Sequence, residues 1–259
     1  MTTSYFSSSD GGFLPGPDAV GPWSADMMHG RFFGGLAARA LEREVGGLGW
    51  RVARLTVDLF RPAPMELVEV STDIVRQGRR IRVADAVVTV AGRAVASVRA
   101  VALAEGAPPP GDMWKAPEWA SPAPDTLPRI EHFLDSVAEL PAWDLRVHEG
   151  GVNSSERSRV WTNDQGHLVD LEPMTSLVRA ALSGDLASPL SNGSDAGIGY
   201  INGDYTLALA RYPRGAWVGL ETTTHLAHDG IAVGASTLYD LDGPFGTSTT
   251  TALANPILE

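Results

Sequence analysis

The sequence predicts an α+β fold of two tandem modules, in each of which one long helix is wrapped by an antiparallel sheet. The main evidence is an internal repeat: a shift of 150 positions places residues 55–61 over residues 205–211, with threonine and arginine in register. Each half also contains one segment with apolar residues at helical spacing, followed by four apolar-rich runs. Turn signals such as Gln77-Gly78 and Asp229-Gly230 separate these runs.

Length and composition limit the possible functions. A chain of 259 residues has room for two modules of about 100 residues each. No window approaches the roughly 18 to 20 consecutive apolar residues of a membrane-spanning helix. The net charge of -11 argues against binding to nucleic-acid phosphates. The absence of cysteine excludes disulfides, thiolate metal ligands and a cysteine nucleophile.

The N-terminal module is predicted to cover residues 1–104. Its first residues have neither the basic start nor the apolar run of a signal peptide, so we expect a cytoplasmic protein. Residues 13–23 could hold one edge strand. Apolar residues recur at helical spacing over residues 32–45, and Gly46-Gly47 ends that helix. Residues 52–103 are predicted to form four antiparallel strands joined by tight turns.

A proline-rich stretch, residues 105–128, is predicted to link the modules. Proline cannot lie in an inner strand, so we expect an extended and semi-rigid segment here. Residues 130–140 are predicted to form a short helix or an irregular cover.

The C-terminal module is predicted to cover residues 129–259. Residues 144–162 alternate weakly and are expected to supply its opening strands. Pro173 is expected to be an early residue of the second helix. That helix continues at least to Leu186 and is broken by Ser191-Asn192-Gly193-Ser194. Four strands follow and end near residue 254.

Several strings resemble a known family. A glycine-rich helix start, His29-Gly30-Arg31-Phe32-Phe33-Gly34-Gly35, and a strand end, Phe60-Arg61-Pro62, resemble the hotdog fold of acyl-CoA thioesterases. Residues 202–207, 217–221 and 238–240 are similar to strings of the double-hotdog acyl-CoA thioesterase II family and its thioesterase-like relatives. The resemblance implies a double hotdog, a role in lipid metabolism and a coenzyme A thioester as substrate, with no bound cofactor or metal.

The resemblance also implies which side chains hold the water that attacks the thioester carbonyl. The family has an aspartate on the second helix, and this position falls on Asp185. It has a threonine or asparagine on the next strand, and this position falls on Asn202. The glutamine position falls on Thr250, or on Thr251 if the register slips by one. An ionised aspartate can take a proton from water. Loss of one oriented donor costs roughly 10²- to 10³-fold in rate, so we expect a slow enzyme.

The first helix adds candidates for substrate binding. Gly34 and Gly35 lie near its start, where N–H groups and the helix dipole can polarise a carbonyl oxygen. They would equally allow close packing of the helix on a sheet. His29 precedes the helix, and pairing of the modules could bring it near Asp185. An apolar channel between the two helices would hold the acyl chain. Four arginines at the first hairpin tip could meet coenzyme A phosphates or form a solvated surface: Arg76, Arg79, Arg80 and Arg82.

Three hypotheses for the function remain open. The first is hydrolysis of acyl thioesters with Asp185 as the base. The second is an enoyl-thioester hydratase or dehydratase that uses His29 with Asp185. The third is a non-catalytic acyl-CoA-binding module. The sequence contains no nucleophile elbow, Walker loop or His-Glu-x-x-His pair. Because pairing of the modules leaves outer sheet faces available, we expect a homo-oligomer.

Overall fold

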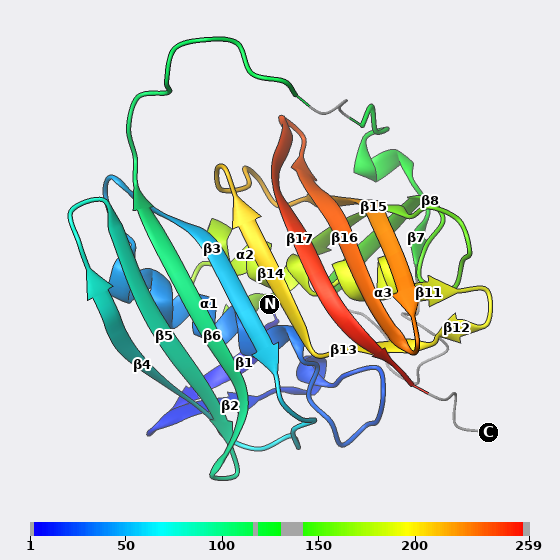
Figure 1. The fold of residues 1–259 in the computed structure, drawn as a ribbon. Helices are drawn as coiled ribbons and strands as arrows, with labels where there is room; N and C mark the ends of the chain where they lie inside the picture. Colours follow the sequence, from blue (N-terminus) through cyan, green and yellow to red (C-terminus); the bar gives the residue numbers. More distant parts are fainter. Residues whose placement is uncertain (1–2, 116–118, 131–141, 256–259) are drawn as a thin grey trace.

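The structure is a computed structural model that describes residues 3–115, 119–130 and 142–255. Among the described residues, far more lie in strands, nearly all of them antiparallel, than in the three α-helices, so the fold belongs to the predicted α+β class (Figure 1). Fifteen of the described strands form one sheet, in the order β10-β1-β2-β4-β5-β6-β3-β14-β17-β16-β15-β9-β8-β7, with β13 beside β17. None of the described helices is long and apolar enough to cross a membrane.

The first helix, α1 (Arg31–Val45), confirms the prediction for residues 32–45. Its apolar stripe is buried, with Leu36, Ala37 and Leu41 each 0% exposed. The helix ends at Gly46, whose N–H donates to the Glu42 carbonyl oxygen over 3.0 Å. A side chain at this position would overlap that same oxygen, which explains the glycine.

The four predicted antiparallel strands of the first half are confirmed, but only β4, β5 and β6 form a meander. Strand β3 pairs with β6, so residues 60–67 cross to β4 on the far side of these strands instead of forming a tight turn. The four strands pair antiparallel in the order β4-β5-β6-β3. They are β3 (Trp50–Leu59), β4 (Val68–Gln77), β5 (Ile81–Val90) and β6 (Arg93–Ala104).

The second half repeats this arrangement and adds two opening strands, as predicted. The four main strands are β14 (Asp204–Leu209), β15 (Val218–His228), β16 (Ile231–Asp240) and β17 (Gly243–Ala254). The opening strands are β8 (Trp143–Glu149) and β9 (Arg159–Asp164). The shorter strands are β7 (Arg129–Ile130), β10 (His167–Val169), β11 (Gly193–Ser194), β12 (Gly197–Ile198) and β13 (Tyr200–Asn202).

The two halves join where β3 pairs antiparallel with β14, at the centre of Figure 1. Thr56 lies opposite Thr206, and their hydroxyls are hydrogen-bonded over 3.2 Å. These are the two threonines that a shift of 150 positions superimposes. The pairing is therefore the one that a twofold axis through the two threonines would produce.

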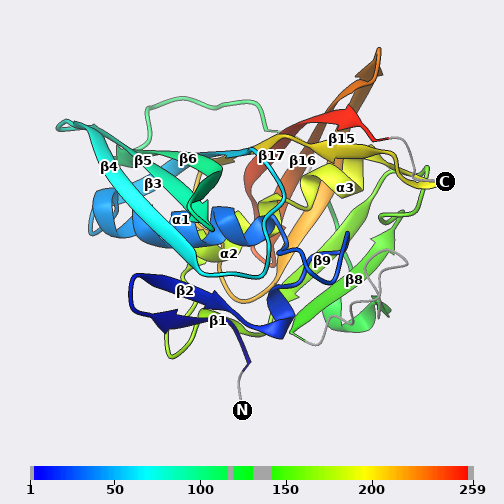
Figure 2. The same ribbon diagram turned by 90° about the horizontal axis from the view of Figure 1, so that it is seen from below.

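The helices lie on one face of this sheet, and the sheet curls around them (Figure 2). Helices α1 and α2 (Ser176–Gly184) touch each other at Gly35. A Cβ atom there would come within 2.7 Å of Leu182 Cδ2. Glycine thus allows the close approach of the two helices.

The second helix differs from the prediction in two respects. Pro173 is not an early helical residue, because α2 begins at Ser176 with Thr175 as its N-cap. The Thr175 hydroxyl accepts a hydrogen bond from the Val178 N–H over 3.2 Å, which satisfies one free donor at the helix start. After Gly184 the helix tightens for one turn, and it resumes as α3 (Ala187–Asn192).

The strand expected within residues 13–23 is present near the start of that range, but it belongs to an N-terminal hairpin and is not an edge strand, because it lies between two other strands. Strand β1 (Ser4–Ser9) pairs antiparallel with β2 (Gly12–Pro15), and residues 17–19 form a 3₁₀ turn. Strand β1 also pairs in parallel with β10, while β2 contacts the edge of β4. The hairpin therefore connects the first half of the chain to the second.

The proline-rich stretch is packed at its C-terminal end. Trp119 stacks on Trp161, with ring centroids 5.5 Å apart, and lies edge-on to Tyr239 at 5.7 Å. A 3₁₀ turn, Pro124–Thr126, follows. The segment expected to form a short helix or cover, residues 130–140, lies almost wholly outside the described residues.

Candidate functional site

Asp185 occupies the junction between α2 and α3, in a helical conformation with φ -62° and ψ -29°. Strands β14 and β17 hold this junction. Gly184 packs on Leu207, whose Cδ2 atom would lie 2.5 Å from an added Cβ. The Ser248 hydroxyl donates to the Gly184 carbonyl oxygen over 2.8 Å. The junction is thus fixed on two sides, and Asp185 is only 8% exposed.

Asn202, on β13, contacts Asp185 as the predicted site requires. Its Nδ2 atom donates to Asp185 Oδ1 over 3.0 Å and to the Asp204 carbonyl oxygen over 3.4 Å. The Thr250 hydroxyl donates to the same carbonyl oxygen over 2.8 Å. The three residues predicted to be catalytic therefore belong to one hydrogen-bonded group.

Thr250 and Thr251 lie on opposite faces of β17. Thr250 is 2% exposed, whereas Thr251 is on the exposed face. There, the Thr251 hydroxyl donates to Asp204 Oδ2 over 2.9 Å and its N–H donates to Asp204 Oδ1 over 2.7 Å. Of the two registers left open by the sequence, only that of Thr250 faces the helix that carries Asp185.

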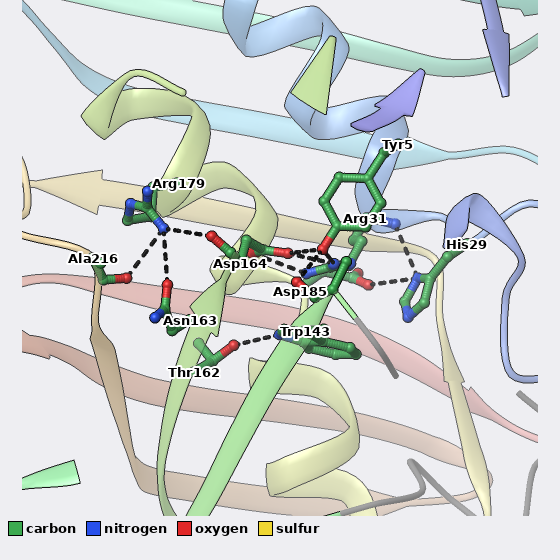
Figure 3. A network of polar contacts seen from close by, with 11 residues as sticks. Tyr5, His29, Arg31, Trp143, Thr162, Asn163, Asp164, Arg179, Asp185 and Ala216 are labelled. Atoms are coloured by element: carbon green, nitrogen blue, oxygen red, sulfur yellow. Dashed lines mark hydrogen bonds and ion pairs between the residues drawn. The ribbon is translucent and has the colours of Figure 1, made fainter. Parts of the chain in front are cut away.

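His29 lies beside Asp185, as expected if the two halves pair. Its Nδ1 atom is 3.9 Å from Asp185 Oδ2 and accepts a hydrogen bond from the Arg31 backbone N–H over 3.3 Å (Figure 3). Burial lowers the pKa of His29 to about 3, and the positive charge of Arg31 acts in the same direction. The imidazole is therefore neutral near pH 7, and its contact with Asp185 is not an ion pair.

Opposing effects act on the Asp185 carboxyl group. Burial raises its pKa above the ordinary value of an aspartate, because the charged form loses hydration. The hydrogen bond from Asn202 and the positive charge of Arg31 partly oppose this shift. Burial, and to a smaller extent the same carboxylate, raises the pKa of Tyr205, whose hydroxyl donates to the Ala181 carbonyl oxygen. Asp185 thus combines the raised pKa and the oriented donor that a general base uses.

The buried Arg31 lies next to the predicted site, although it is not among the residues predicted from the sequence. Its guanidinium forms a bidentate pair with Asp164, with N–O distances of 2.6 and 3.2 Å, and lies 4.0 Å from the Trp143 ring centroid. Tyr5 donates from its hydroxyl to Asp164 Oδ1 over 2.7 Å. A charged residue within the buried stripe of α1 was the only signal in the sequence for this group.

Gly34 and Gly35 have packing roles in the structure. A side chain on Gly34 would overlap the Tyr205 hydroxyl, and one on Gly35 would meet Leu182. As the fourth and fifth residues of α1, both direct their N–H groups into the helix. A contribution of these glycines to carbonyl polarisation stays a prediction.

The cavities lined by described residues include two near the helices, and Asp185 lines neither of these two. One, of about 340 Å³, lies between α1 and the start of α2, with Arg39, Glu42 and Glu172 in its lining. The other, of about 520 Å³, lies at the end of α3, where Ser191 is in its lining. Both contain charged and polar side chains, unlike the apolar channel expected from the sequence. The Asp185 side chain itself keeps 11% of its surface accessible.

The hairpin arginines divide into two groups. Arg82 stacks on Trp50 at 3.8 Å and donates to carbonyl oxygens at the C-terminal end of α1, so it has a structural role. The other three are exposed: Arg76, Arg79 and Arg80. Across the described part of the chain, no group of three or more metal-ligating side chains comes together.

Comparison with protein families matches both halves of the chain. The sequence model of the acyl-CoA thioesterase N-terminal domain matches residues 19–104, and that of the C-terminal domain matches residues 106–254. A search of curated proteins found no match.

Solved structures with similar folds come from several bacteria. The tesB protein of Mycobacterium avium subspecies paratuberculosis has a TM-score of 0.71 and 14% identity, over 94% of this chain and 93% of that one. A hot dog fold protein of unknown function from Alicyclobacillus acidocaldarius has a TM-score of 0.69 and 17% identity, over 97% and 96%. Acyl-CoA thioesterase II TesB2 from Mycobacterium marinum has a TM-score of 0.65 and 17% identity, over 87% and 90%. At these identities the likeness establishes the hotdog fold.

Proposed function

The chain belongs to the acyl-CoA thioesterase family, and on this premise we propose that it hydrolyses acyl-CoA thioesters with a water molecule activated by Asp185. The observation that carries the proposal is the 3.0 Å hydrogen bond from Asn202 to Asp185, at the junction of two helices. Both residues lie within the segment matched by the C-terminal thioesterase domain. A coenzyme A thioester is accordingly the proposed substrate.

The proposed reaction needs one base and one oriented water. Ionised Asp185 takes a proton from the water, and the water oxygen bonds to the thioester carbonyl carbon. Collapse of the tetrahedral intermediate breaks the carbon–sulfur bond, and the proton held by Asp185 passes to the departing sulfur. The products are a carboxylic acid and free coenzyme A. Asn202 holds Asp185 in place through its Nδ2 atom. The Oδ1 atom of Asn202 is then left to accept a hydrogen bond from the water.

Thr250 accounts for the expected slow rate. Its hydroxyl donates to the Asp204 carbonyl oxygen, and it must give up that 2.8 Å bond before it can donate to the water or to the substrate. A hydroxyl has one proton, whereas the amide of a glutamine has two. We therefore propose an active but slow hydrolase.

We also infer that the chain is a tandem of two hotdog modules. The Thr56–Thr206 register at the junction of the sheets supports this inference, as does the division of the two family matches after residue 104. The boundaries proposed from the sequence are residues 1–104, 105–128 and 129–259.

The proximity of His29 to Asp185 favours a second candidate, the enoyl-thioester hydratase. Such an enzyme needs an imidazole that accepts a proton near neutral pH. Burial keeps the His29 pKa near 3, and Nδ1 already accepts the Arg31 N–H. These two facts make His29 a weak base, so hydrolysis is the better-supported function.

A thiol-release assay over a series of acyl-CoA chain lengths tests the proposal. Asp185→Asn is expected to lower kcat/KM by roughly 10²-fold or more, because it removes the base. Asp73→Asn, an exposed aspartate on β4, is the matched control and should stay close to wild type. Binding without turnover at any chain length would instead identify a non-catalytic acyl-CoA-binding module. Hydration of enoyl-CoA that is lost in His29→Ala would identify the hydratase.

A homo-oligomer and a cytoplasmic location remain part of the proposal. Exposed apolar side chains on neighbouring strands of the outer sheet face support self-association: Leu226, Ile231, Val233 and Leu253. A monomer in sedimentation would contradict the first of these statements. Fractionation of cells would test the second.

A further inference from the structure

A buried group of charged and polar side chains joins three distant parts of the chain beside the proposed base (Figure 3). Arg31 is on α1, Asp164 ends β9 and Tyr5 lies on the N-terminal strand β1. The side chains of Arg31 and Asp164 are 2% and 1% exposed. The Tyr5 hydroxyl donates to Asp164 Oδ1 over 2.7 Å and also lies 2.9 Å from the Ala142 carbonyl oxygen.

Stability alone is a weak explanation for such a group. Desolvation of two charges can cost more than their attraction returns, and apolar replacements of buried ion pairs are often equally stable. The terminal nitrogens of the Arg31 guanidinium are nevertheless held by several contacts. The guanidinium donates to both oxygens of Asp164, donates to the Tyr5 hydroxyl oxygen over 3.3 Å and stacks on Trp143 at 4.0 Å. This is a rigid arrangement at the first residue of α1.

Arg31 is also connected to Asp185, the proposed base, through His29. The Arg31 backbone N–H donates to His29 Nδ1 over 3.3 Å, and that atom lies 3.9 Å from Asp185 Oδ2. The position of the first turn of α1 thus sets the position of His29 beside Asp185. The guanidinium adds a permanent positive charge whose field reaches the Asp185 carboxylate.

The other groups around Asp185 come from different elements. Asn202 approaches from β13 and Tyr205 from β14, while His29 is neutral. Behind Arg31, Asp164 carries a negative charge, and Arg179 of α2 donates to the Asp164 carbonyl oxygen over 3.2 Å. Arg31 is therefore the cation that acts on the carboxylate.

We propose that Tyr5, Asp164 and Arg31 form a positioning unit for Asp185, in which the N-terminal strand clamps Arg31 so that α1 holds His29 and a fixed positive charge against the carboxylate. The inference rests on the proposed function of Asp185 as the base. It gives the N-terminal hairpin a role in the site, although the N-terminal family match begins only at residue 19.

Three variants separate the effect of the positive charge of Arg31 from the effect of the position of its guanidinium. Arg31→Gln combined with Asp164→Asn removes both charges and leaves no unpaired ion in the core. We expect this double variant to move the acid limb of the pH profile of kcat/KM to higher pH by about half a unit or more. Arg31→Lys keeps the charge but loses the bidentate fork, so kcat should fall while the limb stays in place. Tyr5→Phe should lower kcat by roughly threefold or more through misplacement of Arg31.

Arg39→Gln is the matched control. Arg39 lies on the same helix and forms a bidentate pair with Glu172 of the second half, at 2.7 and 2.5 Å, away from Asp185. Arg39→Gln should leave both the acid limb of the pH profile and kcat unchanged. The proposal is overturned if the double variant keeps the wild-type limb, or if Tyr5→Phe behaves like Arg39→Gln. If the double variant fails to fold, Arg31→Lys and Tyr5→Phe decide the question.

A measurement without substrate separates this inference from the proposed function. The ¹³C signal of the Asp185 carboxyl, assigned by its absence in Asp185→Asn, is titrated in wild type and in the variants. A higher midpoint in the double variant, but not in Arg39→Gln, supports the positioning unit even if no thiol is released. Equal midpoints in all of these proteins refute it. Absence of turnover in wild type refutes only the proposed hydrolysis.

Discussion

Asn202 offers a sharp test of the proposed site, because one hydrogen bond joins it to Asp185, the proposed base. Asn202→Ala removes the donor that lies 3.0 Å from Asp185 Oδ1. Hydrogen bonds to charged groups contribute about 1.5 to 3 kcal/mol, and 1.36 kcal/mol corresponds to one pKa unit. The half-exposed position of Asn202 lets water replace part of the lost bond, so we expect a shift of about one unit.

The sign of the shift follows from the role of Asp185. Its carboxylate acts only when ionised, so kcat/KM falls as the pH drops through its pKa. Burial has already raised this pKa, and the Asn202 hydrogen bond limits the rise. Removal of the donor therefore raises the pKa further and moves the acid limb to higher pH. Loss of orientation lowers the plateau as well, by roughly tenfold.

The assay is thiol release as a function of pH at subsaturating acyl-CoA. Asn153→Ala, which truncates an exposed loop asparagine, is the control and should reproduce the wild-type profile. A lower plateau with an unmoved limb would show that Asn202 orients water without acting on the charge of Asp185. A profile identical to wild type would refute the assignment of the site.

Three further predictions follow from the same geometry. Asp185→Asn should raise the thermal midpoint at pH 7 while it lowers kcat/KM. The pKa of Asp185 is raised in the folded state, so stability falls as the pH rises from the ordinary aspartate range through that pKa, and the neutral amide avoids this cost. Equal midpoints in a melting experiment would contradict the buried charge. Thr250→Val, which removes the hydroxyl bound to the Asp204 carbonyl, should lower kcat/KM by about tenfold or less, and a larger loss would assign Thr250 a direct part in the chemistry. Gly34→Ala should destabilise by about 1 to 3 kcal/mol, because the new methyl group meets the Tyr205 hydroxyl; Gly106→Ala, with open space around it, is the control, and equal denaturant midpoints would refute the packing argument.

Local sequence patterns predicted most of the secondary structure. The apolar spacing of α1 and the alternation of the main strands reflect burial on one side of an element, which the sequence records directly. The predicted helix start was wrong where two residues close in sequence could each mark the first turn of α2. Pro173 was compatible with a helix start, but the hydroxyl of Thr175 provided the cap two residues later.

The N-terminal hairpin shows a different limit of sequence analysis. Residues 7–9 are serines on an exposed strand, and only Tyr5 and Phe6 are buried. Two buried residues are too few to define a period. Strand β1 forms because β10, about 160 positions later in the chain, offers it a parallel partner.

By itself, the sequence determined the repeat, the order of one helix segment followed by four strands in each half, and the presence of an aspartate and an asparagine where the thioesterase resemblance implies them. Each of these is a property of residue spacing along the chain. Only the tertiary structure decided that Thr250 rather than Thr251 faces the helix, and that Tyr5, Arg31 and Asp164 meet beside Asp185. The contacts of Asp164 with Tyr5 and Arg31 join residues more than 100 positions apart, and the charge state of a buried group depends on everything packed around it.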